Sequence, residues 1–340
     1  MAELTYSAIL KTVVGGGNLS RPQAHGAFTQ IMEGQWTEAQ IAGLLVALAA
    51  KGETVDEIAG AAMAMREHVV RIDTAGLDVL DTCGTGGTGL STFNVSTAAA
   101  LVLAGAGVPV AKHGNRTNTR ASGSADVLAA LGVNLDAPPD RVARCLREAG
   151  VCFCFAIRCH PAMKYAAPVR KQLGVRTVFN VLGPLTNPAG AKRQVMGVFD
   201  EKLTETIAAV LGALGAARAW VLHAHDGLDE ISTTSPTKIS EWRDGAARTF
   251  TVQPEDFGLK RASLDDLAVD SPQASAEAIR AVLAGQAGPA RDIVVLNAAA
   301  GLVVADRAKS LSDALPLAAK AIDSGAARGA LEKLVALSNE

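Results

Sequence analysis

The sequence has 340 residues, of which 49% are hydrophobic, and its 32 basic and 34 acidic residues leave a formal net charge of -2. This balance excludes a general electrostatic attraction to nucleic acid or acidic membranes, and the apolar fraction excludes a disordered chain. The length is sufficient for two lobes, each with its own core. We therefore expect a folded protein whose partners are small molecules, with neither nucleic acid nor a membrane among them.

The cysteines and the N-terminus favour a cytoplasmic protein. Five cysteines are an odd number in a chain that is long enough not to need disulfides. Cys152 and Cys154 alternate with Phe153 and Phe155, which favours buried strand positions over zinc ligands, since no second ligand pair is evident. The first ten residues lack the basic start and apolar stretch of a signal peptide.

Residues 1–72 are predicted to be helical. An apolar pattern through Leu4, Ile9 and Val13 stops at the glycine run that begins at Gly15. Ser20 is predicted to cap a second helix. The segments 37–40 and 54–57 each have a threonine followed three residues later by Gln or Glu, which is the capping-box pattern, so two further helices are expected there.

From Asp78 onwards, short β-branched runs alternate with glycine-rich turns and alanine-rich helices, the pattern of a parallel α/β sheet. A hairpin is expected around the turn at residues 243–245, followed by a mostly helical C-terminal segment. The predicted strands are 79–81, 109–112, 151–155, 195–199 and 218–222, and the hairpin strands are 238–242 and 248–252.

The segment from Asp81 to Thr97 contains four glycines within six residues, directly after a predicted strand and before a helix. Glycine allows backbone N–H groups to approach an oxyanion closely, and the helix N-terminus adds a partial positive charge. The segment lacks the Gly-Lys-Ser/Thr of a Walker A loop and the spacing of a dinucleotide fingerprint. A phosphate cradle and a tight structural turn both remain open on these residues alone.

A second polar motif, Lys112-His-Gly-Asn-Arg116, ends the next strand, and Ser122 to Asp126 leads from it into a helix. Cations and hydroxyls at strand carboxyl ends suit a phosphate or pyrophosphate, because an open α/β sheet gathers ligands at that edge. A solvated basic loop is the alternative.

Asp229 and Glu230 form an adjacent acidic pair in the turn 226–232, after another predicted strand. Mg²⁺ prefers a few carboxylates together with water and substrate oxygens, so this pair would hold it well opposite a phosphate cradle. An isolated Asp-Glu is usually a solvated turn. Arg170 precedes a proline-punctuated segment, 180–188, and is able to bind a carboxylate with two hydrogen bonds, whereas an ordinary ion pair is the default for a single arginine.

In order and spacing, these segments resemble the anthranilate phosphoribosyltransferase family over roughly residues 5 to 330. The resemblance is carried by the following motifs: Gly-Thr-Gly-Gly at 84–87, Lys-His-Gly-Asn-Arg at 112–116, Gly-Ser-Ala-Asp-Val-Leu at 123–128, His-Pro-Ala-Met-Lys at 160–164 and Asn-Val-Leu-Gly-Pro-Leu-Thr-Asn-Pro at 180–188. It implies transfer of a phosphoribosyl group from phosphoribosyl pyrophosphate (PRPP) to the amine of anthranilate, in tryptophan biosynthesis.

The resemblance also implies an architecture of the nucleoside phosphorylase/phosphoribosyltransferase class, with a small all-helical lobe and a large α/β lobe around a mainly parallel sheet. The helical lobe would comprise residues 1–72 joined by about 166–188, and the α/β lobe residues 73–165 and 189–340. A homodimer through the helical lobe is implied, with the active site between the lobes.

Position by position, the resemblance implies three sets of site residues. The PRPP cradle would comprise Gly84, Gly87, Thr88, Thr92, Asn94, Val95, Ser96, Thr97, Lys112 and Ser124, with a mobile loop of Gly114, Arg116, Thr117, Asn118, Thr119 and Arg120. The anthranilate channel would be lined by His113, Asn115, His160, Arg170 and Pro184. Up to two Mg²⁺ ions would be bound with PRPP by Ser96, Asp229 and Glu230.

Catalytic roles are implied for Lys112, Asn115 and Arg170. Lys112 would stabilise the departing diphosphate, while Asn115 and Arg170 orient the aromatic acid. No protein nucleophile is expected.

The sequence departs from the family pattern at two places. Thr88 stands where the family's glycine turn usually continues with an aspartate that helps to bind the metal–diphosphate, and residues 117–121 replace a segment close to Ser-Val-Ser-Ser-Lys. Arg120 restores the cationic charge one position earlier, as a hypothesis. Two rival functions stay open: a nucleoside phosphorylase-like enzyme, and a catalytically weak relative that binds nucleic acid.

Overall fold

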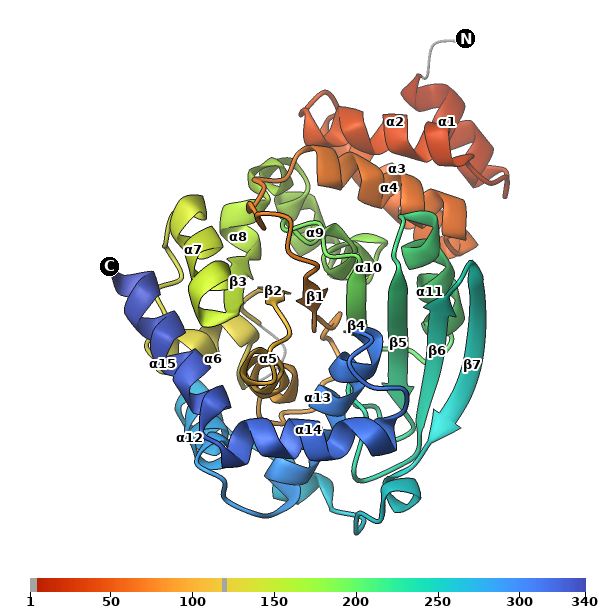
Figure 1. Ribbon diagram of the computed structural model, residues 1–340. Helices are drawn as coiled ribbons and strands as arrows, with labels where there is room; N and C mark the ends of the chain where they lie inside the picture. Colours follow the sequence, from red (N-terminus) through yellow and green to blue (C-terminus); the bar gives the residue numbers. More distant parts are fainter. Residues whose placement is uncertain (1–4, 118–120) are drawn as a thin grey trace.

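The computed structural model describes residues 5–117 and 121–340 and has a helical N-terminal bundle beside a large α/β lobe (Figure 1). The bundle consists of α1 (Tyr6–Val14), α2 (Arg21–Met32), α3 (Glu38–Lys51) and α4 (Val55–Glu67).

The predicted caps of the bundle are confirmed. Thr37 and Thr54 accept hydrogen bonds from the backbone N–H groups of Gln40 and Glu57, and Ser20 precedes α2. Helix α1 ends at Gly15, and Leu4 of its predicted pattern lies outside the described residues. Because capping satisfies backbone groups locally, these boundaries follow from residues three positions apart.

The α/β lobe is built on a seven-stranded sheet with the order β3-β2-β1-β4-β5-β6-β7. Strands β1 to β5 are parallel, and β6 and β7 form the predicted antiparallel hairpin. The bounds are β1 (Leu80–Asp81), β2 (Val110–Gly114), β3 (Val151–Phe155), β4 (Arg193–Gly197), β5 (Arg218–Ala224), β6 (Thr237–Arg243) and β7 (Ala246–Val252). Strand β4 begins two residues before the predicted start at Val195, because Arg193 and Gln194 already pair with β1 and β5.

At β4 and β5, the two faces of the sheet belong to different apolar cores. Trp220 and Leu222 of β5 pack into one core, while Ala219 and Val221 pack into the other, as the alternation of strand side chains requires. Helices α5 (Val95–Gly105), α12 (Pro272–Leu283), α13 (Pro289–Val304), α14 (Leu311–Asp323) and α15 (Ala326–Asn339) cover the first face. Helix α11 (Leu203–Ala213) and the N-terminal bundle share the second core.

The remaining short elements connect these layers. They are α6 (Ser124–Ala130), α7 (Pro139–Ala149), α8 (Ala156–Cys159), α9 (Ala167–Leu173) and α10 (Phe179–Leu182), with the 3-10 helices η1 (Pro161–Tyr165), η2 (Pro184–Thr186), η3 (Pro254–Phe257) and η4 (Leu264–Leu267). Cys152 and Cys154 are fully buried in β3, as predicted for strand positions. A search of the described residues finds no helix with the length and apolarity to cross a membrane.

Candidate active site

The chain reverses direction across the sheet at β1, which lies between β2 on one side and β4 on the other. A crevice at the carboxyl ends of the strands is expected at such a switch point. A cavity of about 360 Å³ lies there, lined by residues that follow β1, β2 and β5.

Most of the predicted donor-site residues line this cavity. They are Gly84, Gly87, Thr92, Asn94, Ser96, Lys112, Gly114, Arg116, Thr117 and Ser124, together with His113, Asn115, Asp229 and Glu230. The structure therefore brings four sequence motifs from separate parts of the chain to one place.

The glycine-rich loop after β1 lies against the acidic turn. The Gly86 N–H donates to Asp229 Oδ2 at 3.2 Å, and the Thr85 N–H donates to the Gly197 carbonyl at 2.9 Å. A Cβ atom at Gly84 would lie 2.8 Å from Asp229 Oδ2. Gly86 and Gly87 have φ values of +63° and +76°, a conformation that favours glycine. Close approach and backbone conformation both explain why this segment contains glycine.

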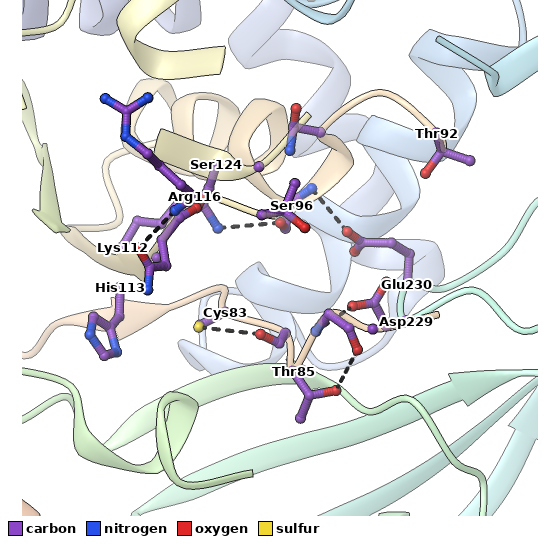
Figure 2. Close-up of a pocket in the computed structure, with 18 of the residues that line it drawn as sticks. Cys83, Thr85, Thr92, Ser96, Lys112, His113, Arg116, Ser124, Asp229 and Glu230 are labelled. Carbon is purple, nitrogen blue, oxygen red and sulfur yellow. Dashed lines mark hydrogen bonds between the residues drawn. The ribbon is translucent and has the colours of Figure 1, made fainter. Parts of the chain in front are cut away.

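Lys112 is buried at the floor of the cavity, where its ammonium group donates to the Thr82 carbonyl at 2.6 Å and to Ser96 Oγ at 3.2 Å. Glu230 Oε1 accepts from the Ser96 N–H at 3.2 Å. In Figure 2, Lys112 and Glu230 approach Ser96 from opposite sides. The ammonium group of Lys112 and the carboxylate of Glu230 thus both contact Ser96. This arrangement suits the joint binding of a phosphate and a cation.

Asp81, which was not among the predicted site residues, is buried next to this floor and holds it in place. Its carboxylate accepts from the His113 N–H at 3.1 Å and from Asn187 Nδ2 at 2.8 Å. Burial raises the pKa of Asp81 to about 6, an effect that nearby Lys112 opposes. Asp81 therefore connects strands β1 and β2 to the segment after η2.

A second cavity of about 380 Å³ adjoins the first and shares His113 and Asn115 with it. It is lined by more apolar side chains, including Met163 and Phe179, and by Arg170. The Arg170 guanidinium lies 5.5 Å from the centre of the Phe179 ring and has no ion pair among the described residues. An apolar pocket that offers a cation without an acidic partner suits a flat carboxylic acid.

His113 and His160 meet between the two cavities, with their Nε2 atoms 3.1 Å apart. One ring must donate and the other accept, so at least the accepting ring is neutral when this hydrogen bond forms. Burial and the neighbouring His160 lower the pKa of His113 to about 3, and burial lowers the pKa of His160 to about 4.

This histidine pair predicts a loss of stability in mild acid. Between about pH 4 and 6.5 the unfolded chain binds protons on both rings and the folded chain does not, so the free energy of unfolding falls as the pH drops through this window. His160→Gln removes one titrating ring. We expect it to reduce the slope by up to about 1.4 kcal/mol per pH unit in urea denaturation at pH 4.5–7. The raised pKa of Asp81 changes the pH dependence of stability in the opposite direction, but Asp81 is present in both the wild type and the variant. Equal slopes of unfolding free energy against pH in the two proteins would contradict the role given to the histidine pair.

Some predicted residues lie elsewhere. Thr88, Val95, Thr97 and Pro184 line neither cavity, and Val95, Thr97 and Pro184 are buried. Asn118, Thr119 and Arg120 lie outside the described residues.

Other lining residues were not predicted as site residues. They include Cys83, Thr85, Gly86, Phe93, Gly123 and Asn180 in the first cavity and Met65, Ile157, Met163, Lys164 and Phe179 in the second. Most adjoin the motifs already singled out, whereas Met65 comes from α4 and carries no local signal of a site.

Comparison with known proteins agrees with this geometry. A family model described as the helical bundle domain of a glycosyl transferase family matches residues 7–69, and one described as its a/b domain matches residues 76–328. The anthranilate phosphoribosyltransferase of Moorella thermoacetica is 55% identical over 329 residues, which cover 97% of each chain. That of Rhodospirillum rubrum is 54% identical, covering 97% of this chain and 94% of its own.

Solved structures show the same fold. The crystal structure of anthranilate phosphoribosyltransferase from Thermus thermophilus superimposes with a TM-score of 0.93 at 43% identity, covering 98% of this chain and 99% of its own. The enzyme from Saccharomyces cerevisiae, in complex with PRPP and Mg, gives a TM-score of 0.90 at 28% identity, covering 99% of both chains. The fold, the arrangement of the site and these similarities lead to one conclusion: the chain belongs to the anthranilate phosphoribosyltransferase family.

Proposed function

We propose that this protein transfers the phosphoribosyl group of PRPP to anthranilate, giving N-(5-phosphoribosyl)anthranilate and pyrophosphate, a step of tryptophan biosynthesis. The observation that carries the proposal is the pair of adjoining cavities, one polar with Lys112 and an acidic pair, the other apolar with Arg170. The relatives named above support it, since they are anthranilate phosphoribosyltransferases.

The donor would bind in the first cavity. The glycine loop offers backbone N–H groups to the diphosphate, and Lys112 supplies a buried positive charge. Ser96, Asp229 and Glu230 present only oxygen atoms, the donor set that Mg²⁺ prefers, and Glu230 already contacts the Ser96 backbone. We propose that these three residues hold up to two Mg²⁺ ions with the donor, where the metal neutralises leaving-group charge.

The acceptor would lie in the second cavity, with its carboxylate on Arg170 and its amine directed towards the first. The bond between C1 of the ribose and the diphosphate breaks, the amine nitrogen bonds to C1, and the amine proton leaves to solvent. Asn115 lines both cavities and is placed to orient the amine. Positioning and charge stabilisation then supply the catalysis, and no protein nucleophile is needed.

The fluorescence of anthranilate provides the direct test. With purified protein, PRPP and Mg²⁺, we expect the fluorescence to fall while pyrophosphate is released in equal amount. Parallel assays address the two rivals. Phosphorolysis of a pyrimidine nucleoside without anthranilate turnover would favour a phosphorylase, and a salt-sensitive mobility shift with nucleic acid, again without turnover, would favour the binding relative.

Thr88 predicts a weaker affinity for Mg²⁺ than an acid would give at this position. Thr88→Asp adds a carboxylate to the glycine-rich loop, so we expect the Mg²⁺ concentration for half-maximal activity to fall several-fold. The control is Thr88→Asn, because an asparagine side chain has the shape of aspartate without its negative charge. An unchanged Mg²⁺ requirement in Thr88→Asp would show that this side chain does not face the metal.

We also propose that the helical lobe is discontinuous and mediates a homodimer. Val169 and Phe179 share the apolar core of the bundle, and the Phe179 ring lies 5.7 Å from that of Phe28, which supports adding residues 166–188 to it. Val14 and Val46 of the bundle are 70% and 45% exposed, an apolar surface that a second copy would cover. Light scattering on the purified protein should give twice the chain mass.

A further inference from the structure

Arg176 lies in the loop between α9 and α10 and reaches the glycine-rich loop from outside the donor cavity. Helix α9 ends at Gly174, which has a φ of +62°, and the loop that carries Arg176 then leads to α10. The Arg176 guanidinium donates from Nη2 to the Gly87 carbonyl at 2.7 Å. Its centre lies 4.1 Å from the centre of the Phe199 ring. One planar group therefore stacks on a ring and hydrogen-bonds to the loop at the same time.

The carbonyl that Arg176 binds determines the direction of a neighbouring donor group. In a trans peptide the C=O of one residue and the N–H of the next point in opposite directions. Holding the Gly87 carbonyl towards Arg176 therefore turns the Thr88 N–H away from it. Gly87 itself lines the donor cavity, so a contact that fixes its peptide acts directly on the wall of that cavity.

Arg176 adds to contacts that hold the earlier part of the loop. The Thr85 and Gly86 N–H groups are bound by the Gly197 carbonyl and by Asp229, both in the α/β lobe. Gly87 follows with a φ of +76° and has no side chain to restrain it. Arg176 restrains this glycine through its carbonyl, from the segment that follows α9, the helix that carries Arg170.

We propose that Arg176 is a positioning residue for PRPP, acting through Gly87 to orient the glycine-rich loop before the donor binds. The inference rests on the proposed function for its substrate and concerns a residue outside the cavity lining. A preorganised loop loses less conformational freedom when the diphosphate binds, so the benefit appears in donor affinity. Acceptor affinity depends on Arg170 and stays unchanged.

The test compares Arg176→Ala with Arg248→Ala. Arg248 is also exposed and lies 5.5 Å from the Phe250 ring on β7, so it matches Arg176 in charge and stacking but not in the contact with the loop. We expect Arg176→Ala to raise the KM for PRPP about tenfold, the effect of losing one charge-assisted hydrogen bond, and to leave the KM for anthranilate within about twofold. Arg248→Ala should change neither constant. Arg176→Lys keeps a charged donor and should recover most of the loss.

Hydrogen exchange measured by mass spectrometry gives a readout that does not depend on turnover. Arg176→Ala should speed exchange in peptides covering residues 84–90 and leave the bundle peptides unchanged. A PRPP KM within twofold of the wild type, an equal rise in both KM values, or unchanged loop exchange would overturn the inference. A wild-type protein without anthranilate turnover would instead overturn the proposed function, while the exchange experiment would still report on the contact between Arg176 and the loop.

Discussion

The double substitution Asp229→Asn with Glu230→Gln lowers kcat/KM for phosphoribosyl transfer by at least about a hundredfold, the scale seen when a preorganised electrostatic group is removed. Both replacements keep the size and one oxygen acceptor of each side chain, so the hydrogen bonds from Gly86 and Ser96 persist. The variant would lose the negative charge that we propose holds a hard cation beside the diphosphate. Part of the activity should return with excess Mg²⁺.

The control for this substitution is Asp265→Asn with Asp266→Asn. These residues form another adjacent acidic pair, exposed on η4, and the replacement changes the net charge by the same amount. Steady-state rates over a range of Mg²⁺ concentrations should match the wild type for this control. Full activity of the Asp229 and Glu230 variant at low Mg²⁺ would reject the metal assignment.

Arg170→Ala raises the KM for anthranilate roughly fiftyfold and leaves that for PRPP within about twofold. The substitution would remove the proposed pair of hydrogen bonds from Arg170 to the substrate carboxylate in a half-buried pocket, where such contacts contribute about 2–3 kcal/mol. Arg170 lines the second cavity and not the donor cavity, so we expect donor binding to be unaffected. Burial lowers the pKa of Arg170, but arginine remains charged at neutral pH.

Lys171→Ala is the matched control for Arg170. Lys171 is the next residue of α9, carries the same charge and is exposed. Its removal should leave both KM values near those of the wild type. An equal rise of both KM values in Arg170→Ala would refute the role as carboxylate ligand and indicate a general disturbance of the cleft.

The elements of the fold were predictable wherever neighbouring residues decide them. The capping residues Thr37 and Thr54 lie three positions before their partners, and the alternation around Cys152 marks β3 as buried. The hairpin turn follows from Asp244 and Gly245, which have φ values of +52° and +81°. Each of these features depends on local geometry.

The candidate site was predictable in part, through motifs at strand ends and the family resemblance. The glycine loop follows β1 and Lys112 lies in the second half of β2, so the sheet places them at one edge. Asp81 was missed because its role comes from Asn187, 106 positions away in the chain. Arg176 carried no signal either, since its partner Gly87 lies 89 positions earlier.

By itself, the sequence determined the helices, the strands, the hairpin and the chemical types gathered at the strand ends, because caps, periodicity and turns act over three or four residues. Only the tertiary structure decided that β1 lies between β2 and β4, which brings Asp229 within hydrogen-bonding distance of Gly86, 143 positions away. The second cavity likewise depends on tertiary packing, because Met65 of α4 and Arg170 of α9 line it together. The physical reason is that contacts over such separations depend on strand order and on which apolar faces are buried together, and no local pattern contains that information.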